Sequence, residues 1–205
     1  MTQRPTALLI DFDGVVRTFD PSINAKIEQR YGLEPGTVLD TALQWERLLP
    51  AITGRMTRPE WLATVADALA DRVGGPQRAA ELMEEWVVYP GVVAPEVLRF
   101  VRDVRAAGHP VALATNSTIE FREVLDSFGL TGEFDAVANS AEIGVHKPAK
   151  EYFIAACALV NTAPARCMLI DDTDRMIRGA RAAGLSAYRY TAGDDLSYPR
   201  RAFGL

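Results

Sequence analysis

The chain contains little cysteine and histidine, no long apolar run and no excess of positive charge. Its 205 residues include 2 cysteines and 2 histidines, and 22 basic residues stand against 27 acidic ones. The net charge of −5 argues against a surface that binds polyanions, so we expect no nucleic-acid partner. No apolar stretch approaches the roughly 20 residues that span a bilayer, and we therefore expect no membrane partner.

The few cysteines also limit the redox chemistry of the chain. Cys157 and Cys167 both lie in apolar segments, which favours buried free thiols over a catalytic thiol. Residues 1–5 lead directly into a strand-like run and carry no signal-peptide pattern. We expect a cytoplasmic protein, either a monomer or a homodimer.

The chain contains a segment with only helical patterns, followed by a segment in which helices and strands alternate. Residues 21–85 show only helical patterns, expected at residues 22–31, 37–48, 59–71 and 77–86. From residue 90 onward, helical patterns at 95–107, 151–160 and 174–183 alternate with short apolar strands. These strands are expected at 111–114, 136–138, 167–170 and 187–190, and the capping box Ser117-Thr118-Ile119-Glu120 predicts that another helix begins there.

Repeated strand–helix units predict a parallel sheet with right-handed crossovers. The expected fold class is α/β, with a doubly wound, Rossmann-like core and an inserted α-helical cap subdomain. We expect residues 1–18 and 89–205 to form the core and residues 19–88 the cap. Such an insertion would lie above the strand ends, in the position of a lid.

Two acids close the first apolar run. Asp11 and Asp13 follow residues 8–10, and Gly14 stands directly behind them. Ligands of open α/β sheets bind beyond the carboxyl ends of the strands. Two carboxylates held close together repel each other unless a cation or a proton neutralises them. One acid can then act as a nucleophile while the other moves a proton, and a divalent metal can bridge them to an anionic substrate.

Polar residues also follow the later strands. Thr115 and Asn116 lie between a strand and a helix, where hydroxyl, amide and backbone N–H groups suit a phosphate. Lys147 lies in a loop that Pro148 restricts, again above the expected sheet. His146 and His109 are expected to be structural.

A second acidic pair, Asp171-Asp172, ends the strand at 167–170. Adjacent acids after an apolar strand are costly to place unless a cation receives at least one of them. One of the two could instead cap the next helix. The pair is therefore a candidate metal site.

The order of these motifs resembles the haloacid dehalogenase-like (HAD) hydrolase superfamily over essentially the whole chain. Residues 140–148 are similar to the subgroup whose α-helical cap follows the first strand, and the helical stretch at 21–86 has the place of that cap. Four motifs in this order are specific, whereas any single one is not. The first motif matches Asp11-Phe12-Asp13-Gly14-Val15, the Ser/Thr motif Thr115, the lysine motif Lys147, and the acidic metal motif Asp171-Asp172.

The resemblance implies a phosphatase mechanism. Asp11 would attack phosphorus and form an aspartyl-phosphate, and Asp13 would protonate the leaving alcohol and later deprotonate water. Mg²⁺, which suits oxygen ligands and a phosphate substrate, would be held by the Asp11 carboxylate, the Asp13 carbonyl and Asp172, with Asp171 a direct or outer ligand. The phosphoryl oxygens would be held by Thr115, Lys147 and the backbone amides of Phe12, Asp13 and Asn116.

The expected activity is hydrolysis of a small phosphorylated metabolite, such as a sugar phosphate. A phosphomutase would use the same core residues, and a non-catalytic binding module would merely keep the fold. A metal-independent 2-haloacid dehalogenase is disfavoured, because that branch lacks the second aspartate and the full acidic motif. Met176 departs from relatives that carry an acid or amide four residues after the metal aspartate.

Substrate choice is expected to depend on the cap. Trp45, Trp61 and Trp86 lie there, although tryptophans on short helices are mostly core residues. Arg55 could pair with a second anionic group, and Arg17 could line the entrance.

Overall fold

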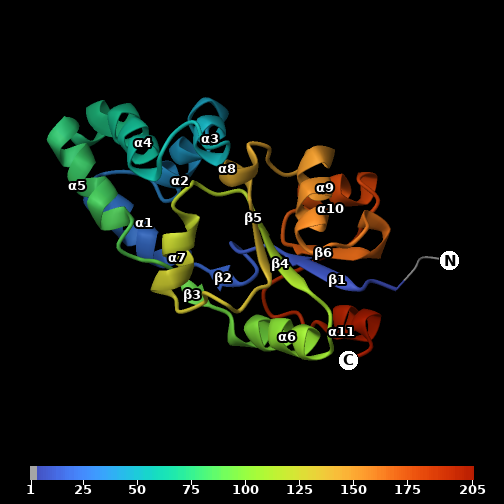
Figure 1. The fold of residues 1–205 in the computed structure, drawn as a ribbon. Coiled ribbons are helices and arrows are strands. Elements are labelled where there is room, and N and C mark those ends of the chain that lie inside the picture. Colours follow the sequence, from blue (N-terminus) through green and yellow to red (C-terminus); the bar gives the residue numbers. More distant parts are fainter. Residues whose placement is uncertain (1–3) are drawn as a thin grey trace.

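A computed structural model describes residues 4–205 and contains a five-stranded parallel sheet (Figure 1). The strand order is β5-β4-β1-β6-β7, so β1 lies at the centre. After β1 the chain builds β4 and β5 on one side and then β6 and β7 on the other. The predicted doubly wound α/β fold is confirmed. The strands are β1 (Ala7–Ile10), β4 (Val111–Thr115), β5 (Ala136–Asn139), β6 (Cys167–Asp171) and β7 (Ser186–Arg189).

Both faces of the sheet are covered by helices. Side chains alternate between faces along a strand, so Leu8 and Ile10 join one apolar cluster and Ala7 and Leu9 join another. The first cluster packs under α6 (Pro95–Ala106), α7 (Phe121–Ser127) and α11 (Ser197–Phe203). The second packs under α9 (Lys150–Leu159) and α10 (Asp174–Ala182), on the opposite side in Figure 1. Short α8 (Ser140–Ile143) and the 3₁₀ turn η1 (Pro164–Arg166) complete this part.

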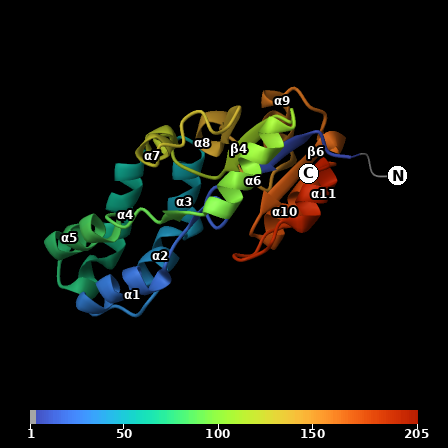
Figure 2. The ribbon, with the colours of Figure 1, turned by 90° about the horizontal axis from the view of Figure 1, so that it is seen from below.

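Five helices form the insertion, which extends away from the sheet (Figure 2). They have an apolar cluster of their own, which includes Leu69 and Leu82 and against which Trp61 and Trp86 pack. No helix within residues 4–205 has the length and apolar character that crossing a membrane requires. The five helices are α1 (Pro21–Arg30), α2 (Thr37–Ala42), α3 (Trp45–Ile52), α4 (Arg58–Val73) and α5 (Pro76–Trp86).

A two-stranded antiparallel ribbon joins the insertion to the sheet domain. β2 (Arg17–Thr18) pairs with β3 (Val92–Val93), with Thr18 opposite Val92. Thr18 Oγ1 also donates a hydrogen bond to the Val92 carbonyl at 3.4 Å. The sequence did not predict this ribbon, because two residues are too few to show a strand pattern.

One buried charge holds the insertion together. Glu28 of α1 is 1% exposed, and its carboxylate accepts hydrogen bonds from the backbone N–H groups of Gly36 and Val38, each at 2.7 Å. These two N–H groups lie at the start of α2, where a helix has unsatisfied donors and favours negative charge. Glu28 therefore fixes α1 against α2.

The helix expected at residues 37–48 is wrong, because the chain forms two helices there. α2 ends at Ala42, and Gln44 adopts an extended conformation (φ −57°, ψ 131°) before α3 begins. The Ala42 carbonyl accepts a hydrogen bond from Trp61 Nε1 at 3.2 Å instead of continuing the helical ladder. A contact with α4, far along the chain, thus replaces a local one.

The capping box expected at Ser117 is also wrong. The Ser117 N–H donates to Ser140 Oγ at 3.1 Å, and α7 begins only after Glu120, which makes no side-chain cap. Both Glu120 carboxylate oxygens accept from the Arg58 N–H at the start of α4, at 3.1 Å each. Glu120 therefore joins the sheet domain to the insertion. The other box, Thr57 with Glu60, is present with both of its bonds.

The two cysteines are buried and free, as expected. Both belong to the apolar cluster under α9 and α10. Cys157 lies on α9 and Cys167 begins β6.

Candidate active site

The site lies where three adjacent strands end. Asp11 follows β1, Thr115 ends β4 and Asp171 ends β6. The Asp11 N–H donates to the Ile170 carbonyl at 2.9 Å, which continues the pairing of β1 with β6 up to the acids. This is the position at which the strand order changes direction, where α/β sheets bind ligands.

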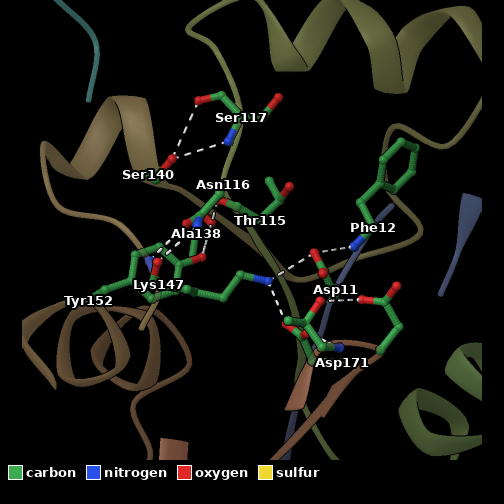
Figure 3. Close-up of polar contacts among 12 residues, drawn as sticks. Asp11, Phe12, Thr115, Asn116, Ser117, Ala138, Ser140, Lys147, Tyr152 and Asp171 are labelled. Atoms are coloured by element: carbon green, nitrogen blue, oxygen red, sulfur yellow. Dashed lines mark hydrogen bonds and ion pairs between the residues drawn. The ribbon is translucent and has the colours of Figure 1, made fainter. Parts of the chain in front are cut away.

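Lys147 joins the two buried acids. Its Nζ lies 2.9 Å from Asp11 Oδ1 and 2.7 Å from Asp171 Oδ2 (Figure 3). All three side chains are largely or wholly withdrawn from solvent. The structure thus brings together three of the residues that the sequence singled out, from positions 24 to 160 residues apart along the chain.

Burial and the closeness of like charges both disfavour the ionised form of the carboxyl groups in this cluster. Burial raises the pKa of Asp11 from 3.8 to about 8; attraction to Lys147 opposes the rise and repulsion from Asp171 adds to it. Burial lowers the pKa of Lys147, but attraction to Asp11 and Asp171 outweighs burial and leaves this pKa above its ordinary value. Lys147 is therefore held as a cation.

Asp172 completes a group of three carboxylates. Ligand oxygens of Asp11, Asp171 and Asp172 lie within 4.8 Å of one another. Gly14 makes room for this arrangement, because a Cβ on its backbone (φ +84°) would overlap the Asp172 carboxylate. Burial raises the pKa of Asp172 as well.

The donor set fits a small divalent cation. The three carboxylates and the Lys147 ammonium carry a formal charge of −2 when all are ionised (−3 + 1). Carboxylate oxygens are the ligands that Mg²⁺ takes in proteins, together with water and substrate phosphate. A dication at this place would neutralise the charge that burial leaves uncompensated.

Asn116 fixes the loop that carries Lys147. Its side-chain oxygen accepts from the Lys147 N–H at 2.8 Å, and its side-chain N–H₂ donates to the Lys147 carbonyl at 3.0 Å. The sequence predicted a phosphate-binding role for Asn116, through its side-chain amide or its backbone N–H group. The side chain instead holds the lysine at the site, which reduces the entropy cost of aiming a flexible ammonium.

The Phe12 amide and Thr115 lie beside the acids. The Phe12 N–H donates to Asp11 Oδ1 at 2.7 Å, so in this structure it binds the carboxylate predicted to be the nucleophile. Thr115 is buried at the end of β4, the strand next to β1. Their predicted contacts with phosphate stay predictions.

The carboxylate of Asp13 stands apart from the three-carboxylate group. Its side chain is 50% exposed, and its Oδ1 lies 2.6 Å from Arg17 Nε. Asp13 thus has a different environment from Asp11, two residues earlier. Such a contrast between neighbouring carboxyl groups is typical of acids with different chemical roles.

Sequence reasoning missed several buried polar residues behind the site. Tyr152 on α9 donates its O–H to the Ala138 carbonyl at 2.6 Å. Asn139 donates from its side chain to the Thr118 carbonyl at 2.8 Å, and Ser140 binds the Ser117 N–H. These bonds fix the loops after β4 and β5. The available signal was the polar Asn-Ser pair directly after the expected strand at 136–138.

The insertion reaches the site at two places. The Trp45 ring lies edge-on to His146, with ring centroids 5.2 Å apart, and Gly54 approaches the Ala141 carbonyl so closely that a Cβ would overlap it. Trp45 is 47% exposed, so it is a contact with the sheet domain and the expectation of a core tryptophan is wrong for it. His146, beside Lys147, therefore packs against the insertion.

Comparison with known proteins agrees with this geometry. Residues 5–184 match the family model for haloacid dehalogenase-like hydrolases. The chain is 35% identical over 127 residues to a phosphoserine phosphatase of Thermus thermophilus, covering 59% of this chain and 50% of that protein. It is 28% identical over 192 residues to the fructose-1-phosphate phosphatase YqaB of Escherichia coli, covering 91% of this chain and 97% of that protein.

A solved structure shares the fold over nearly the full length. A HAD family enzyme from Bacteroides thetaiotaomicron, crystallised with magnesium and inorganic phosphate, superimposes with a TM-score of 0.73 at 19% sequence identity. The match covers 95% of this chain and 98% of that one. With the family model spanning most of the sequence, the chain belongs to the haloacid dehalogenase-like hydrolases.

Proposed function

We propose that the protein is a Mg²⁺-dependent phosphomonoester hydrolase that acts on a small phosphorylated metabolite of the sugar-phosphate kind. The observation that carries this proposal is the contact of Lys147 Nζ with both Asp11 and Asp171, beside Asp172. A carboxylate, a fixed cation and a set of oxygen ligands meet at one edge of the sheet, where adjacent strands end. The names of the two relatives given above, both phosphatases of small molecules, support the same conclusion.

Asp11 would serve as the nucleophile. One of its oxygens forms a bond to phosphorus while the bond from phosphorus to the ester oxygen breaks, and Asp13 gives that oxygen a proton. Water then attacks the phosphorus of the aspartyl-phosphate and gives a proton to Asp13. The bond from phosphorus to the Asp11 oxygen breaks, which releases inorganic phosphate and restores the Asp11 carboxylate. The exposed position of Asp13 supports a role in exchanging protons with substrate and water.

Asp11, Asp171 and Asp172 would hold the metal, together with the Asp13 carbonyl. When bound, Mg²⁺ supplies positive charge that keeps Asp11 ionised and attracts the phosphate group. Lys147 supplies further positive charge, and Thr115 with the Phe12, Asp13 and Asn116 amides would hold the phosphoryl oxygens. Fixed donors of this kind are usually the largest contribution to catalysis.

The same residues argue against dehalogenation. Displacing a halide needs a nucleophilic carboxylate but no proton for the leaving group, which would leave Asp13 without a use. It also needs no cation, whereas Asp171 and Asp172 meet Asp11 here. Phosphoryl chemistry uses all four acids.

We also propose that residues 19–88 form a cap subdomain over a core of residues 1–18 and 89–205, of which residues 1–3 lie outside the described part. The separate apolar cluster of the helices supports this division. Trp45 and Arg55 would then meet the leaving group from the cap side. Arg55 Nε donates to Thr53 Oγ1 at 3.1 Å, which leaves its other N–H groups for an anion.

Phosphate release from a panel of small phosphate esters, with Mg²⁺ and with EDTA, tests this function. We expect turnover that EDTA abolishes and that Asp11→Asn eliminates while the variant stays folded. Chloride release from 2-chloropropionate without metal would support dehalogenation instead. Transfer of the phosphoryl group to a second hydroxyl of the substrate would show a mutase.

A further inference from the structure

Arg17 is the single side chain that binds the Asp13 carboxylate in the described residues. Its Nε lies 2.6 Å from Asp13 Oδ1. The two side chains differ in exposure, since that of Arg17 is 14% exposed and that of Asp13 is 50% exposed. The arginine is thus the fixed partner, and the carboxylate is the one that faces solvent.

Three aromatic rings hold the guanidinium in place. Its central carbon lies 4.7 Å from the centre of the Phe12 ring, 4.8 Å from that of Phe19 and 5.7 Å from that of Phe128. Cations are attracted to the faces of aromatic rings at these distances, and the attraction grows as water is excluded. Arg17 Nη1 also donates a hydrogen bond to the Pro90 carbonyl at 3.3 Å. The guanidinium therefore has a defined position even before Asp13 is considered.

The backbone between the two residues is closed into a tight loop. The Arg17 N–H donates to the Phe12 carbonyl at 2.8 Å, and the Gly14 N–H donates to the Arg17 carbonyl at 2.8 Å. Phe12 and Asp13 thus have short connections to Arg17 through both main chain and side chain. A rigid loop and a rigid guanidinium leave Asp13 few orientations.

We propose that Arg17 is a positioning residue for Asp13, and that it aims this carboxyl group at the ester oxygen of the substrate. The inference rests on the proposed function, in which Asp13 protonates the leaving alcohol. A general acid must lie within hydrogen-bond reach of the atom that it protonates, and small misplacements reduce the rate strongly. An exposed aspartate without a fixed partner would sample several rotamers instead.

Arg17 also has contacts on both linkers to the insertion. Phe19 and Pro90 belong to these linkers, and Arg17 itself is in β2. The position of the guanidinium therefore depends on the β2–β3 ribbon. A purely structural role for Arg17, as a packing residue of this ribbon, is the competing explanation that a test must separate.

The leaving group of the substrate provides that separation. An alkyl phosphate needs protonation of a strongly basic alkoxide, whereas p-nitrophenyl phosphate releases a stabilised anion that needs little acid catalysis. General acids contribute about 10²–10⁴-fold, so we expect Arg17→Met to lower kcat/KM for an alkyl phosphate by about 10- to 100-fold. For p-nitrophenyl phosphate we expect a loss below about threefold.

A double-mutant cycle with Asp13→Asn completes the experiment. If Arg17 acts through Asp13, Arg17→Met has no further effect on kcat/KM in the Asp13→Asn background. Arg17→Lys keeps a cation near the carboxylate and should recover most of the activity on the alkyl ester. Arg102→Met is the matched control, because Arg102 pairs with Glu133 on the surface of α6 and should leave both substrates unaffected.

Equal losses on both esters, or additive losses in the double mutant, would overturn the proposal and assign Arg17 to packing alone. Unchanged activity of Arg17→Met would overturn it too. If Arg17→Met does not fold, as judged by circular dichroism, the same comparison of esters is made with Arg17→Gln, which keeps a polar side chain but removes the cation. Failure of the proposed function is seen separately, as absence of turnover in the wild-type protein or survival of turnover in Asp11→Asn.

Discussion

Two buried carboxylates, Glu28 in the insertion and Asp11 at the end of β1, differ in the groups that surround them. Glu28 accepts two backbone hydrogen bonds at the start of α2. Asp11 has one amide and Lys147, but it also faces Asp171, and burial raises its pKa to about 8. The protein itself supplies the hydrogen-bond partners that stabilise the Glu28 carboxylate. For the Asp11 carboxylate it supplies them only in part, because Asp171 repels it.

This difference teaches that burial of an acid does not by itself indicate function. Backbone N–H groups at a helix start stabilise a carboxylate without any ligand. A carboxylate beside other carboxylates gains from an added cation. The buried acids that are candidates for function are therefore those whose charge the protein leaves for a ligand to neutralise.

The largest expected contrast is in catalysis. Lys147→Met removes the cation between Asp11 and Asp171, and we expect kcat to fall about 10²- to 10³-fold, as on loss of a fixed donor. Glu28→Gln should leave kcat within about twofold, because the carboxylate of Glu28 binds the start of α2 within the insertion and not the strand ends. Steady-state phosphatase assays in excess Mg²⁺, at a temperature where both variants are folded, make the comparison. Similar losses in the two variants would contradict the distinction between these charges.

For the stability of the fold, Glu28 is expected to matter, in contrast to its small expected effect on kcat. Glu28→Ala removes two hydrogen bonds to a charged group, and we expect a loss of about 3 kcal/mol in the free energy of unfolding. Urea titration followed by circular dichroism measures this quantity. Glu84→Ala is the control, since Glu84 is an exposed acid on α5. A loss no larger than in Glu84→Ala would show that the buried bonds contribute nothing.

A divalent cation should stabilise the protein through the three-carboxylate group of Asp11, Asp171 and Asp172 and not through Glu28. Mg²⁺ at about 100 times its Kd is expected to raise the free energy of unfolding by about 2.7 kcal/mol. Asp172→Asn should remove this gain, because Asp172 belongs to the three-carboxylate group. Glu28→Gln should keep it. Thermal unfolding with Mg²⁺ and with EDTA provides the measurement, and an equal gain in Asp172→Asn would place the cation elsewhere.

The pH dependence of the metal-free protein follows from the raised pKa of Asp11. Between the unfolded value of 3.8 and the folded value of about 8, the folded state keeps a proton that the unfolded state has lost. The unfolding free energy that Asp11 contributes is therefore present below pH 3.8 and is lost as pH rises toward 8. Thermal unfolding in EDTA between about pH 5 and 8 should show this decline. Asp11→Asn should flatten it, and an unchanged slope in that variant would assign the decline to other groups.

The smallest expected effect concerns the contact between the regions. Glu120 accepts from the Arg58 N–H at the start of α4, and an acid at a helix start contributes about 0.3–1 kcal/mol. Glu120→Gln should lower the free energy of unfolding by about that amount. Asp67→Asn, at an exposed position in the middle of α4 and away from any helix start, is the control and should change less. The two are compared by urea titration at low salt, and equal changes would mean that Glu120 does not act through α4.

Much of the sheet domain could be predicted because its signals are local. Apolar runs, helix starts and the acids after Ile10 and Ile170 are visible in short windows of sequence, and a parallel sheet brings strand ends to one edge. For this reason the meeting of Asp11, Lys147 and Asp171 was foreseen.

Other features depend on residues distant in sequence. The bond from Trp61 to the Ala42 carbonyl divides the helix expected at 37–48, and Glu120 binds α4 instead of capping α7. Neither partner is visible from the local pattern. The same holds for the two hydrogen bonds between the Asn116 side chain and the Lys147 backbone, which join positions 31 residues apart.

The β2–β3 ribbon has a consequence for how such a protein can change. Because Thr18 lies opposite Val92, the chain leaves the sheet domain and returns to it at nearly one point. The entropy of closing a connection grows only slowly with its length, so an exchanged segment between these positions costs the sheet little. A different helical module spliced between Phe19 and Pro90 would keep both of these contacts of Arg17 and would place a new set of side chains beside the same strand ends. The ribbon is therefore a suitable place at which to exchange the insertion and to test whether it sets substrate choice.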